Sequence, residues 1–111
     1  MKIEQRQVND IPILALHGRF DAMTSEHLEE RLKSVIDGGA RNICLDLNAV
    51  EFISSSALRV LLTSLKEVKK NEGIIVLAAM PSHVREVFDL AGFLELFAVQ
   101  ETCEEALKIF E

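Results

Sequence analysis

Short apolar segments with strand character alternate along this chain with longer segments in which apolar residues recur every three or four positions. Residues 43–47 and 74–79 are of the first kind, and residues 55–72 between them have the spacing of a helix with one buried face. Strands that are separated by helices pair in parallel through right-handed crossovers, and the helices cover the sheet. The alternation therefore predicts a small α/β domain.

The start of the chain departs from this alternation. Two predicted strands, residues 3–8 and 13–17, are separated by Asn9 and Asp10, which favour a tight hairpin turn, and Pro12 stands near the start of the second strand. A hairpin pairs its strands antiparallel, so the sheet should be mixed. We expect four strands with the most apolar one, 74–79, at the centre, and a short edge strand at 97–99 would make five.

Capping residues mark the ends of about four helices. The expected boundaries are a first helix from Thr24 or Ser25 to Gly38 and Gly39, a second from Ser55 or Ser56 to Gly73, a third capped by Ser82, and a last one from Thr102 and Glu105 to Phe110. In the second helix the inward face should consist of Leu58, Leu61, Leu62, Leu65 and Val68, and the solvent face of Arg59, Lys66, Lys69 and Lys70.

The charge of the chain limits its partners. Its 111 residues form one domain, and 12 basic against 18 acidic residues give a formal net charge of −6. A nucleic-acid partner requires a clustered basic surface, and an anionic membrane attracts basic segments, so the composition argues against both. The first residues do not have the pattern of a leader segment and no apolar run reaches membrane-spanning length, so we expect a protein without a leader, cytoplasmic and of bacterial type.

The sequence predicts no metal, cofactor or disulfide. His17, His27 and His83 are scattered without the spacing of metal ligands. Cys44 lies within a buried-looking strand and Cys103 follows a predicted helix cap. Without a leader segment, both cysteines should be reduced thiols.

Three consecutive serines, Ser54, Ser55 and Ser56, precede the second predicted helix. One of their hydroxyls is expected to cap the helix by accepting a hydrogen bond from a first-turn N–H group, and Ser55 is the favoured candidate. A helix N-terminus also favours an anion, so another hydroxyl in this run is a candidate for carrying a phosphate.

The sequence resembles the STAS-domain family of bacterial anti-sigma-factor antagonists in three places. The central match is Asp46-Leu47-Asn48-Ala49-Val50-Glu51-Phe52-Ile53-Ser54-Ser55-Ser56-Ala57-Leu58. Before and after it lie Gly18-Arg19-Phe20-Asp21 and Leu90-Ala91-Gly92-Phe93-Leu94-Glu95-Leu96-Phe97, so the resemblance covers essentially the whole chain. Two positions depart from the family pattern, because Ser54 replaces an acidic residue and Ala57 replaces a glycine.

The resemblance implies a binding module and not an enzyme. In this family the unphosphorylated domain binds an anti-sigma factor that is also a serine kinase, phosphorylation of a serine releases it, and a metal-dependent serine phosphatase resets the domain. The resemblance places the phosphorylated serine at Ser56, which would be the first helical residue and point outward, with Ser55 as the less favoured alternative. The partner-binding residues that it implies are Asp21, Ser54, Ser55, Ser56, Ala57, Arg59 and Val60.

The strongest alternative is a STAS scaffold that is never phosphorylated and serves as a subunit of a signalling or lipid-transport complex, which Ser54 in place of an acidic residue favours. An enzyme is poorly supported, because a nucleophilic serine needs an oriented base and the chain has no Gly-x-Ser-x-Gly motif. A response-regulator receiver is disfavoured, because a hairpin follows the first strand where that fold needs clustered acidic residues.

Overall fold

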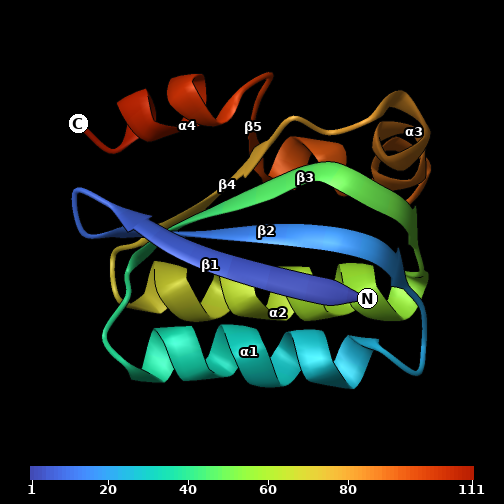
Figure 1. Cartoon of the computed structure of the whole chain (residues 1–111), viewed down its shortest axis with the longest axis horizontal. Helices are drawn as coiled ribbons and strands as arrows, with labels where there is room; N and C mark the ends of the chain where they lie inside the picture. Colours follow the sequence, from blue (N-terminus) through green and yellow to red (C-terminus); the bar gives the residue numbers. More distant parts are fainter.

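The computed structural model describes residues 1–111 and contains a five-stranded sheet between two layers of helices (Figure 1). The strands are β1 (Lys2–Val8), β2 (Ile11–Phe20), β3 (Asn42–Ile53), β4 (Ile74–Ala78) and β5 (Ala98–Gln100), and they lie side by side in chain order. β1 runs antiparallel to β2, and every other neighbouring pair is parallel. The predicted mixed α/β sheet is therefore confirmed, with the fifth strand present.

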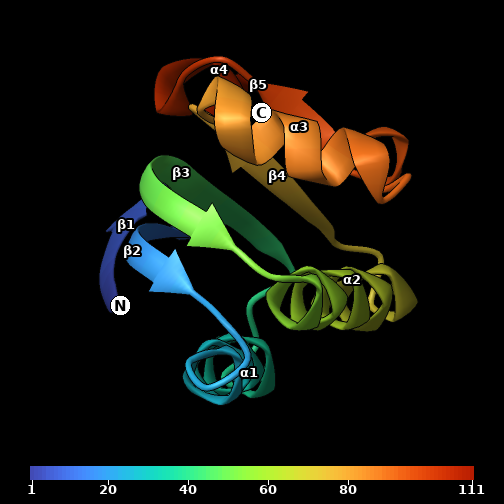
Figure 2. The same ribbon diagram turned by 90° about the vertical axis from the view of Figure 1, so that its right-hand side faces the viewer.

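The four helices divide into two pairs. α1 (Ser25–Asp37) and α2 (Ser55–Lys70) cover one face of the sheet, and α3 (Ser82–Leu90) and α4 (Cys103–Ile109) lie on the other (Figures 1 and 2). A short 3-10 turn, η1 (Leu94–Leu96), connects α3 to β5. The start of α2 lies at the same end of the molecule as the ends of β2 and β3 (Figure 2).

The hairpin between β1 and β2 has a loop of two residues. Asn9 and Asp10 have φ angles of 51° and 66°, and Val8 pairs directly with Ile11. Positive φ at both central positions is the requirement of a type I′ turn, whose twist matches that of the strands it joins. The predicted hairpin is confirmed.

Two strands are longer than the apolar runs that predicted them. β3 continues through Asn48 and Glu51 to Ile53, and β2 continues to Phe20, which pairs with Ile53. Register shifts along the β2–β3 pair allow this polar stretch to stay paired. Apolar periodicity gives no sign of such shifts, so the sequence predicted strands that are too short. The expectation that residues 74–79 form the central strand is wrong, because β3 is central; β4 is still an interior strand with four buried residues among its five.

The helix ends agree with the prediction in part. The Thr102 hydroxyl accepts a hydrogen bond of 3.1 Å from the Glu105 N–H, and Gly39 has a positive φ of 105° after α1. Ser82 is not a cap, because Pro81 occupies the N-cap position and Ser82 is the first helical residue. α2 ends at Lys70, and Gly73 is needed for another reason: a Cβ there would overlap the backbone carbonyl of Arg41.

The core forms two clusters, one of 20 residues and a smaller one of five residues that packs under α4. Most of the predicted inward face of α2 is buried, namely Leu58, Leu61, Leu65 and Val68. Leu62 is a correction, because it is only half-buried while Ser64 is buried in its place. The helix is rotated so that Ala57, Leu61 and Ser64 face the sheet and α1, which leaves Leu62 at the margin.

Candidate functional site

The three serines lie where β3 passes into α2, at the carboxyl edge of the parallel strands (Figure 2). The backbone N–H of Ser54 donates a hydrogen bond of 2.8 Å to the carbonyl of Phe20, the last residue of β2. This bond joins the segment after β3 to the segment after β2, so Asp21 and the serines belong to one edge of the molecule. The parallel pairing of β2 and β3 explains this proximity.

Ser54 is the cap of α2. Its backbone is extended, with φ −89° and ψ 167°, and its Oγ accepts a hydrogen bond of 3.2 Å from the N–H of Ala57. The expectation that Ser55 caps the helix is wrong by one residue, because β3 continues to Ile53 and leaves a single extended residue before the helix. Ser55 and Ser56 are therefore the first and second helical residues.

Ser55 and Ser56 have hydroxyls that make no hydrogen bond within the chain. Ser55 is exposed and Ser56 is half-buried. The expectation that Ser56 is the first helical residue and points outward is therefore corrected: Ser56 is the second helical residue, and its side chain is partly covered. Their backbone N–H groups lie in the first helical turn, where no intrahelical acceptor is available. Such groups, together with the helix dipole, stabilise an anion placed on either hydroxyl.

Asp21 holds the turn between β2 and α1. Its Oδ1 accepts hydrogen bonds of 3.0 Å from the N–H groups of Met23 and Thr24, and the Thr24 Oγ1 accepts one of 2.9 Å from the Asp21 N–H. The bond from the backbone of Thr24 is the main cause that lowers the pKa of Asp21 below its ordinary value. The Thr24 hydroxyl is committed to this turn and does not cap α1. The edge therefore carries a negative charge fixed by its own backbone.

Apolar and cationic side chains border the serines. The guanidinium of Arg19 lies 4.5 Å from the centre of the Phe52 ring, and 37% of Phe52 is exposed. Met23, in the Asp21 turn, is 85% exposed. Sequence reasoning missed all three residues. Arg19 and Phe52 stand within the recognised motifs near the ends of two neighbouring parallel strands, and this position could have predicted that they lie side by side.

The remaining predicted contact residues divide between surface and core. Arg59 is exposed, on the helix face that it shares with Ser55. Val60 is half-buried and lines a shallow groove between α1 and α2 with Ile36, on the flank that it shares with Ser56. Ala57 is fully buried, so its methyl group belongs to the core and is not part of any contact surface.

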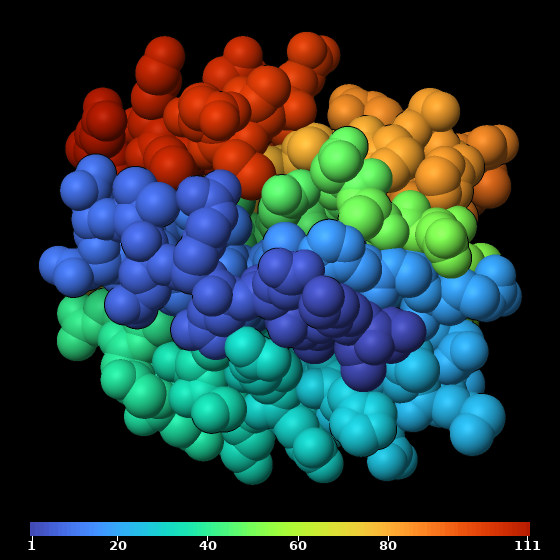
Figure 3. Space-filling model, in the orientation of Figure 1, coloured from blue at the N-terminus to red at the C-terminus, as the bar shows by residue number.

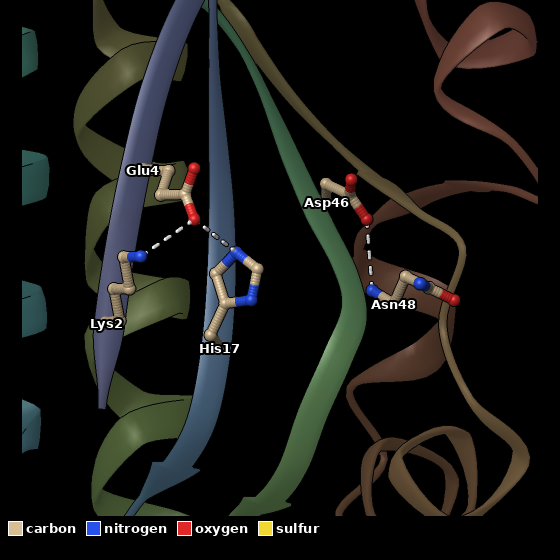
Figure 4. A network of polar contacts seen from close by, with 5 residues as sticks. All are labelled: Lys2, Glu4, His17, Asp46 and Asn48. Carbon is tan, nitrogen blue, oxygen red and sulfur yellow. Dashed lines mark hydrogen bonds and ion pairs between the residues drawn. The ribbon is translucent and has the colours of Figure 1, made fainter.

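Other polar groups and thiols lie away from this edge. Glu4 on β1 is 3.3 Å from Lys2 and 3.4 Å from His17, while Asp46 accepts a hydrogen bond from the Asn48 N–H on β3 (Figure 4). Cys44 and Cys103 are free thiols, and burial raises the pKa of Cys44 to about 12. No three metal-ligating side chains converge, and none of the helices combines the length and apolar character of a membrane span.

Comparison with known proteins places this architecture in a family. Residues 2–106 match the STAS domain. The chain is 36% identical over 111 residues to BtrV of Bordetella bronchiseptica, whose name describes an anti-sigma factor antagonist, with coverage of 100% of this chain and 96% of that protein.

Solved structures share the fold at lower identity. An anti-sigma factor antagonist of Thermotoga maritima has a TM-score of 0.90 at 22% identity, covering 96% of this chain and 92% of that one. The antagonist SpoIIAA in its unphosphorylated form gives a TM-score of 0.85 at 21% identity, covering 98% and 96% of the two chains. Its phosphorylated form, from Bacillus, gives 0.78 at 20% identity with coverage of 99% and 100%.

Proposed function

Because this chain belongs to the STAS-domain family and is an anti-sigma factor antagonist, we propose that the edge carrying Asp21 and the serines binds its anti-sigma factor. In this proposal the anti-sigma factor is also a serine kinase that phosphorylates Ser56 with ATP, and the phosphorylated protein dissociates. The bound state frees a sigma factor, so phosphorylation acts as the off-signal.

The observation that carries the proposal is that the three serine hydroxyls differ in their hydrogen bonding and in the helix face on which they lie. Ser54 Oγ is occupied as the cap, whereas the hydroxyls of Ser55 and Ser56 are uncommitted and belong to the first helical turn, whose N–H groups lack intrahelical acceptors. Ser56 lies on the flank of α2 that it shares with Val60, which lines the groove between α1 and α2. A kinase seated over this groove would meet Ser56 before Ser55, which lies on the helix face that carries the exposed Arg59. The relative SpoIIAA occurs in a phosphorylated form, which supports a switch of this type.

The two departures from the family pattern are compatible with this function. Ser54 replaces an acidic residue, but serine and aspartate are about equally good at an N-cap, and Ser54 makes the capping bond. Ala57 replaces a glycine at a helical position where its methyl group is buried, so no added atom obstructs the surface.

The charge of the phosphate supplies the free energy of release. A phosphoserine adds about −1.5 to −2 charges at neutral pH. On a chain of net charge −6, beside the ionised Asp21, this addition repels an acidic partner surface and imposes the cost of desolvating a dianion on the interface. The domain does not need to refold, because the helix terminus already accommodates an anion.

A complete cycle requires a serine phosphatase that removes the phosphate, and we include such an enzyme in the proposal. We also place the protein in the bacterial cytoplasm, since the proposed partner controls transcription there.

Incubation with the anti-sigma factor and ATP, followed by phosphopeptide mapping, tests the proposal. We expect one phosphate on Ser56, which Ser56→Ala abolishes and the matched control Ser55→Ala retains. Phosphate on Ser55 alone would contradict the assignment to Ser56. Binding of the anti-sigma factor without transfer of phosphate would support the second candidate, a STAS scaffold that is not phosphorylated, which the serine at position 54 favours.

A further inference from the structure

β1 is an open edge of the sheet, with no strand on its outer side. It has seven residues, without proline and without a register shift in its pairing with β2, and five of the seven are exposed while the other two are half-buried. The residues of β1 form a strip on the surface that no later segment of the chain covers in this view (Figure 3). The opposite edge, β5, has only three residues. Proteins commonly protect an edge by shortening, bulging, covering or charging it, and of these β1 has only its charged side chains, Lys2, Glu4 and Arg6.

The hairpin determines which backbone groups face the open side. In a two-residue hairpin the residues that flank the turn, here Val8 and Ile11, form a hydrogen-bonded pair. Bonding alternates along an antiparallel strand, so Lys2, Glu4 and Arg6 also bond to β2. The N–H and C=O groups of Ile3, Gln5 and Gln7 therefore point away from the sheet and are free to bond to another strand.

The side chains of β1 separate by face. Gln5 accepts a hydrogen bond of 3.2 Å from Arg31 on α1, and Ile3 packs on the core on that same side. Glu4 contacts His17 on the opposite face of the sheet (Figure 4), which it shares with Lys2 and Arg6. One face of the edge strand thus carries charges that alternate in sign: positive, negative, positive.

This pattern is complementary to itself. Gln5 is the middle residue of β1, so full antiparallel overlap of two copies places Gln5 opposite Gln5 and pairs the edge-facing backbone groups of residues 3, 5 and 7 with one another. The same register places Glu4 opposite Arg6 of the second copy, twice by symmetry. Overlaps centred on Glu4 or on Arg6 would bring like charges together.

We infer that β1 is a self-association surface, on which two copies of this chain join their sheets edge to edge in the register that pairs Glu4 with Arg6 of the other copy. The occupant is a second copy, because the charge order of β1 is complementary to itself in the full-length antiparallel register. The inference is independent of the proposed function, since the serine edge lies at the ends of β2 and β3 and stays accessible. The contact is small, so we expect a weak dimer.

Sedimentation equilibrium on the full chain at low salt, from about 10 μM to about 1 mM, tests this inference. The wild type should approach twice the mass of one chain at the highest concentrations, and added salt should weaken the association. Glu4→Arg and Arg6→Glu each place like charges opposite one another and should weaken association at least about tenfold. An equimolar mixture of the two variants should associate again, because every charge then meets its opposite.

Two controls separate this register from general charge effects. Glu86→Arg and Lys66→Glu change the net charge by the same amounts on exposed surfaces of α3 and α2, and they should associate like the wild type. Amide exchange should slow at Ile3, Gln5 and Gln7 as concentration rises, whereas Lys2, Glu4 and Arg6 should not change. A wild type that stays monomeric at about 1 mM, or a mixture that associates no better than each variant alone, would overturn the inference. Thermal unfolding of every variant verifies that it is folded.

Discussion

At Asp21 the geometry of the turn between β2 and α1 depends on the charge of one side chain. Two backbone N–H groups and the Thr24 hydroxyl converge on one carboxylate oxygen, at distances of 3.0, 3.0 and 3.2 Å. Hydrogen bonds of this kind favour the ionised carboxylate, which is why the pKa of Asp21 lies below its ordinary value. The turn that positions Asp21 for a partner therefore also depends on its charge.

Asp21→Asn should lower the melting temperature at neutral pH, because the amide keeps the acceptor oxygen but loses the charge. A carboxyl whose pKa is lowered on folding stabilises the protein above its unfolded pKa, about 3.9, and this stabilisation is lost as pH falls through the folded pKa. The difference between wild type and variant should therefore be largest above about pH 4 and shrink in more acidic solution. Thermal unfolding followed across pH measures this difference.

The matched control for this measurement is Asp89→Asn on α3, an exposed aspartate whose side chain makes no hydrogen bond. It should leave the melting temperature nearly unchanged at every pH. A pH-independent difference between wild type and Asp21→Asn would show that the charge of Asp21 does not stabilise the turn.

At the scale of the elements, apolar spacing located α2 but did not fix its rotation. The 3–4 spacing predicted Leu58, Leu61, Leu65 and Val68 correctly, because a single helix face supplies them all. It could not distinguish Leu62 from Ser64 at the margin of that face, since the contact with α1 decides which flank is covered. The predicted cap was wrong for a similar reason. The starting point of α2 depends on how far β3 stays paired with β2, and the spacing of apolar residues does not give that length.

The rotation of α2 can be measured by three substitutions. Leu61→Ala should lower the free energy of unfolding by about 2–5 kcal/mol, because it opens a cavity in a fully buried site. Leu62→Ala should cost about 1 kcal/mol, since the side chain is only half-buried, and Lys66→Ala should stay within about 0.5 kcal/mol. Denaturant unfolding measures all three. A cost for Leu62→Ala equal to that for Leu61→Ala would restore the helix face predicted from spacing.

At the scale of the whole molecule, strand and helix order carried the most information. The hairpin signal, the alternation and the three motif segments predicted one α/β domain with a mixed sheet, and its family, because each depends on residues near one another in the chain. The surroundings of the serines could not be predicted in the same way. Phe52 and Met23 become surface features only when the parallel register brings the ends of β2 and β3 together, and the stacking of Arg19 on Phe52 arises from that register.

The net charge of the molecule leads to a prediction about Ser56→Asp. The carboxylate would lie at the start of α2, where the helix dipole favours an anion, so the melting temperature should be unchanged or slightly higher. Binding to the anti-sigma factor should weaken about 5- to 150-fold, because the chain already carries −6 and the added charge opposes an acidic partner surface. Titration calorimetry at several salt concentrations measures this loss, which should shrink as salt screens the repulsion.

Ser56→Asn, of nearly the same size without the charge, is the matched control and should bind much more like the wild type. Equal weakening by both variants, independent of salt, would mean that size and not charge excludes the partner. In that case a phosphate would act by occupying the docking surface next to Val60, and the electrostatic explanation of release would fail while the assignment of the surface would stand.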